Sequence, residues 1–232
     1  GVVSVAKTAV TGMGGSESGD PVELFLGQSR DYLVGKGTQG FDVSSVVWSF
    51  KDGKLSYTDC NPGVYTYELS KQCAEKALAL DPASDQATTL IARSYLAQVA
   101  AIENNGIKDL PTARLQMVAM AMGPAVLGNA LNESIANNQP FVAKAAIEAL
   151  GKTLDKDSIE GSPLLAALGN SNKVIKYSAA LAVTRASRSN NVPEADKVVA
   201  ILAQAIAEKA QMRVASVGFS KDVAKTQIRT AS

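Results

Sequence analysis

The sequence predicts an all-α fold in which short helices stack in pairs as an α-α superhelix, after a small N-terminal β-hairpin. Composition changes near residue 70: only two of the 36 alanines precede it, whereas eleven of the 18 glycines do. Because alanine favours helices and glycine disfavours them, the two parts differ in structure. Proline is tolerated only in the first turn of a helix, so each proline in the second part marks a boundary. These prolines are Pro82, Pro111, Pro124, Pro140, Pro163 and Pro193.

The part before residue 65 is predicted to hold few elements. Residues 1–20 include GMGGSESGD, which has too few apolar side chains to pack, and form a flexible lead-in. Residues 21–64 begin with a helix over 21–34 and continue with VVWSFKDGKLSYT, which alternates apolar and polar residues around Asp52-Gly53. Asp-Gly favours the positive φ angles of a tight turn, which predicts a β-hairpin. An isolated hairpin is marginal in water, so we expect one face to pack on the helices.

Two pairs of residues in this region each allow two interpretations. Trp48 and Tyr57 are either aromatic residues that cover the adjoining core or a platform that binds a ligand. Cys60 and Cys73 are the only cysteines of the chain. They are either a disulfide or two free thiols, one on a loop and one packed on a helix. They lack the spacing and the histidines that are typical of a zinc site.

Residues 65–122 are predicted to form helices joined by tight connections. In YELSKQCAEKALALDPASDQATTLIARSYLAQ, at 67–98, Ala74 and Ala77 share one helix face, Asp81-Pro82 ends that helix and Tyr95 lies on the next. This pattern resembles a TPR junction. In that family small residues let paired helices approach closely, and the tyrosine fills the groove of the next helix. The resemblance implies one and a half degenerate TPR-like repeats at most.

Residues 123–210 contain an internal repeat. The segments VAKAAIEALG at 142–151 and VIKYSAALAV at 174–183 align without gaps at an offset of 32 residues. Each follows a short apolar helix, at 124–135 and 162–169, and a polar turn. The pattern looks like the second helix of a HEAT repeat, and the chain resembles a bacterial HEAT-repeat protein. That resemblance implies a solenoid whose second helices line a concave surface.

The tail is predicted to form one more helix and the start of another domain. Pro193, Glu194 and Asp196 suit the first turn of a helix. Its stripe at helical spacing comprises Val198, Leu202, Ala205, Ile206 and Lys209. Residues 211–232 then indicate a strand and a helix, which resemble the opening βα unit of a truncated receiver-like domain. A single strand needs a pairing partner, so we expect a homodimer through residues 212–232.

Several chemistries are not expected of this chain. It has no histidine, which removes Ser-His-Asp and Cys-His sites and the usual zinc-water enzymes. Its 23 lysines and arginines balance 22 acidic residues, which argues against a nucleic-acid surface. The apolar runs are far shorter than the about 20 residues that cross a bilayer. We therefore predict a protein that is not an enzyme, binds no cofactor or metal, and inserts into no membrane.

The predicted function is a protein-protein interaction scaffold that binds a peptide or protein on the solenoid surface. Lys144, Glu148, Lys152 and Lys176 are the candidate partner contacts, because they fall on the non-core side of the second helices; ordinary solubility is the other interpretation. The alternative function is a sensor or targeting arm of a larger signalling or catalytic protein whose active domain lies beyond residue 232. The compartment stays open: cytoplasmic, or periplasmic or cell-envelope if an upstream signal peptide has been removed.

Overall fold

The computed structural model of the chain describes residues 20–37, 45–51, 53–108, 110–187 and 191–208. Within these residues the chain forms nine α-helices and one two-stranded antiparallel sheet, which confirms a mainly helical fold with a small N-terminal hairpin. The elements in order are α2 (Pro21–Leu33), β1 (Val46–Lys51), β2 (Lys54–Asp59), α3 (Tyr65–Leu80), α4 (Asp85–Asn105), α5 (Thr112–Ala121), α6 (Pro124–Ala136), α7 (Pro140–Thr153), the 3-10 turn η1 (Lys156–Ser158), α8 (Pro163–Ala167), α9 (Lys173–Ser187) and α10 (Ala195–Ala207).

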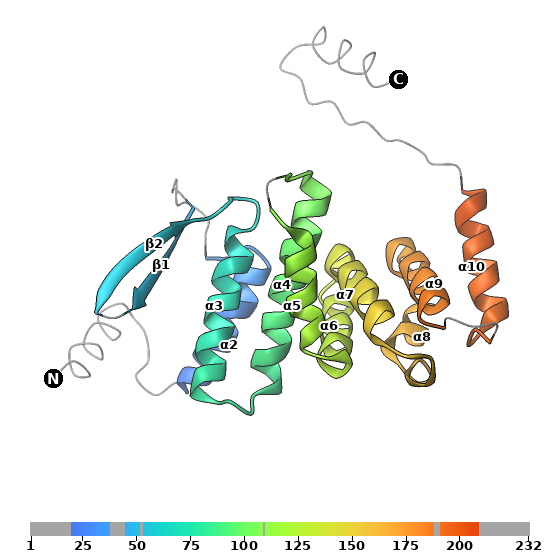
Figure 1. Cartoon of the computed structure of the whole chain (residues 1–232), viewed down its shortest axis with the longest axis horizontal. Coiled ribbons are helices and arrows are strands. Elements are labelled where there is room, and N and C mark those ends of the chain that lie inside the picture. The colour runs from blue at the N-terminus through green and yellow to red at the C-terminus, as the bar shows by residue number, and fades with distance from the viewer. Residues whose placement is uncertain (1–19, 38–44, 52, 109, 188–190, 209–232) are drawn as a thin grey trace, which may run out of the picture.

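The helices follow one another along the long axis of the molecule, from α2 and α3 beside the hairpin to α10 at the other end (Figure 1). Prolines begin α6, α7 and α8, as the sequence predicts. Of the predicted lead-in over residues 1–20, only Asp20 is described. The predicted strand and helix over residues 211–232, and the homodimer contact expected of them, lie outside the described residues.

The β-hairpin forms where Asp52-Gly53 predicts it. Gly53 has a φ angle of +76°, the positive value that the tight turn requires. Val47 is buried and belongs to the strand that contacts α3, as expected for the inner face of the hairpin. Ser49 and Thr58 share that face, because side chains alternate along a strand and Thr58 pairs with Val47.

The outer face of the hairpin carries the aromatic pair. Trp48 lies opposite Tyr57 in the strand register, and their ring centroids are 5.3 Å apart. Trp48 is 54% exposed and Tyr57 is 61% exposed. The interpretation that these rings cover the adjoining core is therefore wrong. The strand register explains the exposure of Trp48 and Tyr57, because the pleat that buries Val47 turns both rings away from the helices.

Three buried serines join the helices next to the hairpin. Ser70 of α3 lies between Ser29 of α2 and Ser94 of α4, with an Oγ–Oγ distance of 2.9 Å to each. All three residues are fully buried, and their small hydroxyls satisfy one another while the helices pack closely. The apolar side chains of this cluster are Leu26, Leu33, Ala74, Ala77, Ala87, Leu90, Ile91 and Ala97.

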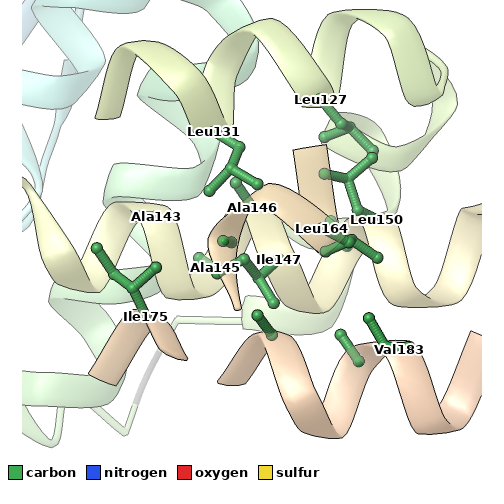
Figure 2. Packing of buried hydrophobic residues seen from close by; sticks show 14 of the residues in the cluster. Leu127, Leu131, Ala143, Ala145, Ala146, Ile147, Leu150, Leu164, Ile175 and Val183 are labelled. Carbon is green, nitrogen blue, oxygen red and sulfur yellow. The ribbon is translucent and has the colours of Figure 1, made fainter. Parts of the chain in front are cut away.

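A second apolar cluster extends from α4 to α10, and α7 lies within it. Leu127 and Leu131 of α6 approach α7 from one side, and Ile175 and Val183 of α9 approach from the other (Figure 2). Alanines at the crossing points let these helices lie close together. The segments at 142–151 and 174–183, which repeat at an offset of 32 residues, thus lie on neighbouring helices.

Two helices differ most in length from the others. α4 has 21 residues, because no proline interrupts it before Gly106, which ends it in a left-handed conformation with φ +63°. α8 has only five residues, because the polar turn at 170–172 follows it closely. Leu164 and Leu168 are nevertheless buried, so this short segment still contributes to the core.

The stripe predicted for the last helix is partly wrong. Val198 is buried together with Ile201, which the predicted stripe omits, whereas Ile206 is 86% exposed. Among the described elements α10 packs mainly on α9. This contact buries only Val198 and Ile201, which are three residues apart on one side of the helix, and not a broad face. Lys209 lies outside the described residues. The helix also begins at Ala195, later than the predicted start, because Glu194 is its N-cap.

Candidate functional site

The four residues predicted to contact a partner make ion pairs or hydrogen bonds with other side chains of the chain, and two of the four contact each other. Lys144 and Glu148, one turn apart on α7, form an ion pair of 3.3 Å. Lys144 also lies 3.4 Å from Glu103 of α4. Partial burial alone would lower the pKa of Lys144, but the two carboxylates outweigh it, and the pKa is raised. Lys144 therefore stays charged while it links α7 to α4.

Lys152 and Lys176 lie at other helix junctions. Lys152 Nζ donates a hydrogen bond of 2.7 Å to Gln116 Oε1 of α5. Lys176 Nζ donates one of 3.4 Å to Gln204 Oε1 of α10. Each lysine thus reaches from α7 or α9 to a neighbouring helix. These residues line the seams between helices.

A cleft of about 370 Å³ opens between the hairpin and the helices. Its volume lies in the range of pockets that bind small ligands, about 300–1,000 Å³. The hairpin, α3, α4 and the start of α5 supply its lining. The lining residues are Val47, Ser49, Thr58, Asp59, Cys60, Asn61, Val64, Glu68, Gln72, Gln98, Leu110, Pro111 and Leu115.

Glu68 is the central polar group of this cleft. One carboxylate oxygen lies 2.6 Å from Lys71 Nζ, and the other accepts a hydrogen bond of 3.2 Å from Gln98 Nε2. Lys71 Nζ also lies 5.3 Å from the ring centroid of Tyr95. Burial alone would lower the pKa of Lys71, but Glu68 outweighs it, and the pKa is raised. The carboxylate is thereby held in place on α3 by contacts to its own helix and to α4.

This cleft was not predicted from the sequence. Val64, Glu68 and Gln72 are spaced four residues apart, which places an apolar, an acidic and an amide side chain on one face of α3. That spacing is a signal for a mixed surface. It does not identify the opposite walls, which come from the hairpin and from the residues after α4.

The two cysteines are free thiols, which confirms the second interpretation of them. Cys60 lines the cleft, and Cys73 lies on α3. Burial raises the pKa of both thiols; nearby Glu68 raises the pKa of Cys60 further.

We therefore expect both cysteines to react with iodoacetamide at higher pH in the folded chain than in the unfolded chain. The thiolate is the reactive form, and a raised pKa delays its appearance as the pH increases. Mass spectrometry of each alkylated peptide, over a pH series in buffer and in urea, gives the two midpoints. A folded-state midpoint at or below the unfolded-state one would contradict this expectation.

No cluster of three or more metal-ligating side chains occurs among the residues that the structure describes. None of the described helices is both long and apolar enough to span a bilayer. Comparison with protein-family models, with curated proteins and with solved structures found no match to this chain.

Proposed function

We propose that the chain is a non-catalytic interaction scaffold, an α-α superhelix of TPR-like and HEAT-like helix pairs that binds a peptide or protein. The observation that carries the proposal is the direct packing of α7 on α9, which hold the two segments that repeat every 32 residues. A Cβ atom added at Gly151 of α7 would lie 2.9 Å from Ala182 Cβ of α9. Units that each contact their neighbours build extended binding surfaces.

The seams between helices support a binding role. Lys144 and Lys176 occupy matching positions of the two repeats, since they too are 32 residues apart. Each reaches a polar side chain on an adjacent helix rather than the core. A partner laid along the array would therefore meet a charged side chain at regular intervals, and such complementary charges favour association and specificity.

The test uses the full chain as bait in its native cell lysate, beside a Lys144→Glu, Lys176→Glu double variant. A Lys36→Glu, Lys54→Glu double variant is the control, because it changes the net charge equally at exposed lysines elsewhere. A protein captured by the wild type is identified, purified and titrated. We expect about tenfold weaker binding to the first variant and unchanged binding to the control.

Circular dichroism of each variant first establishes that the helices are retained. Failure of the wild type to bind any captured protein in the purified titration contradicts the scaffold function. Equal affinity for all three chains instead contradicts only the assignment of the contact to the seams of α7 and α9.

A further inference from the structure

We infer that the cleft between the hairpin and α3 to α5 binds an extended segment of a partner protein, in which a lysine or arginine stands among apolar residues. This inference rests on the proposed scaffold function and adds to the seams of α7 and α9 a second contact site, with a stated partner chemistry. Three features of the cleft carry it: its charge, its amide groups and its size.

The charge of the lining is of one sign. Asp59 and Glu68 are acidic, and no lysine or arginine lines the cleft within the described residues. Asp59 is exposed at the rim, and Lys71 offsets Glu68 only. Each carboxylate oxygen has two lone pairs, so Glu68 can accept further hydrogen bonds. A cationic side chain of a partner would therefore find uncompensated negative charge at the rim.

Two glutamine amides line the same cleft. Among the described residues, Gln72 has no side-chain hydrogen bond, and Gln98 uses only its N–H group, toward Glu68. A side-chain amide offers a donor and an acceptor, as a peptide group does. Because α3 and α4 place Gln72 and Gln98 in one cleft, they are suited to hold the main chain of an extended peptide.

An extended chain suits this open cleft of about 370 Å³ better than a helix does. It is thinner than a helix, which is about 10 Å across with its side chains, and its alternate side chains point to opposite sides. Such a chain can place apolar groups against the apolar lining while its basic residue reaches the rim. The apolar lining is Val47, Val64, Leu110, Pro111 and Leu115.

The probe for this site is a phage-displayed library of random dodecapeptides, selected on the full chain. We expect the enriched peptides to carry lysine or arginine between apolar residues. A fluorescent copy of the most enriched peptide should bind an Asp59→Asn, Glu68→Gln variant about tenfold more weakly than the wild type. An Asp157→Asn, Glu160→Gln variant is the control, because it removes the same groups at exposed positions away from the cleft.

The native thiols locate the bound peptide. We expect the peptide to slow iodoacetamide alkylation of Cys60, which lines the cleft, and to leave that of Cys73 unchanged. Added sodium chloride should weaken binding, because it screens exposed charges. Both substitutions in the cleft variant keep the shape of the side chain, and its circular dichroism shows whether the helices persist.

Several results would overturn the inference. They are enrichment of no peptide, enrichment of peptides without basic residues, or equal affinity for the cleft variant and the control. If the peptide instead loses affinity for the Lys144→Glu, Lys176→Glu variant, the cleft is excluded while the scaffold function stands. A protein captured from lysate that binds the cleft variant and the wild type with equal affinity likewise excludes the cleft and leaves the scaffold function in place. Failure of both the library and the lysate to yield a binder contradicts the scaffold function itself.

Discussion

Replacement of Glu133 by alanine is expected to lower the free energy of unfolding by about 3 kcal/mol, because it leaves a buried charge without its partner. Arg93 of α4 is only 3% exposed. Its Nη1 atom lies 2.6 Å from Glu133 Oε2 of α6, and its Nη2 atom donates a hydrogen bond of 2.8 Å to Gln139 Oε1. Within the described residues its Nε atom has no hydrogen-bond partner, so Glu133 supplies half of its contacts.

Burial lowers the pKa of Arg93, and the adjacent Glu133 carboxylate opposes that effect. The guanidinium nevertheless stays charged, since arginine does not lose its proton in proteins. Without Glu133 the Arg93 guanidinium remains buried with Gln139 as its only side-chain partner among the described residues. A water molecule can reach Glu133, which is 42% exposed, so the loss falls below that for a fully buried pair.

Urea unfolding followed by circular dichroism measures the effect. An Arg93→Met, Glu133→Ala double variant removes both charges. We expect its loss in free energy of unfolding to be smaller, by about 1 kcal/mol or more, than the sum of the losses of the two single variants. Glu148→Ala is the control, because its ion pair with Lys144, whose side chains are 28% and 36% exposed, is worth only about 0.5 kcal/mol. Equal losses for Glu133→Ala and Glu148→Ala would show that Arg93 does not depend on Glu133.

Features of the fold that depend on neighbouring residues could be predicted from the sequence. Asp52-Gly53 fixes the hairpin because only certain residues accept positive φ angles. Pro124, Pro140 and Pro163 fix the starts of three helices because proline lacks the N–H group that the helix interior needs. The two segments that repeat at an offset of 32 residues lie on α7 and α9, which pack against each other. Each of these signals lies within a few residues of the feature it predicts, or in a direct repeat.

Features that depend on distant residues could not be predicted. The exposure of Trp48 and Tyr57 follows from which face of the hairpin meets α3, and alternation alone does not select that face. Ile206 is apolar and correctly spaced, yet no described helix covers it. The cleft combines residues from Val47 to Leu115, so its acidic character appears only after the hairpin, α3, α4 and α5 have assembled.

The contact between α7 and α9 is expected to reverse the usual effect of a glycine-to-alanine change. Alanine in place of glycine stabilises a helix by up to about 1 kcal/mol. At Gly151, however, the new Cβ atom would lie 2.9 Å from Ala182 Cβ and 3.1 Å from Ala182 Cα. Because one of these atoms is backbone, α9 has to move. Gly151→Ala is therefore expected to lower the free energy of unfolding by about 1–3 kcal/mol.

Gly27→Ala is the matched control for that prediction. Gly27 lies within α2, and a Cβ atom there would meet nothing within 4 Å. We expect this change to raise the free energy of unfolding by about 0.5–1 kcal/mol. Because both substitutions add one methyl group to a helix, opposite signs in urea unfolding isolate the contact with Ala182 from helix propensity. Stabilisation by both would mean that α7 and α9 have room between them, and that the small residue at 151 is not needed for the repeats to pack.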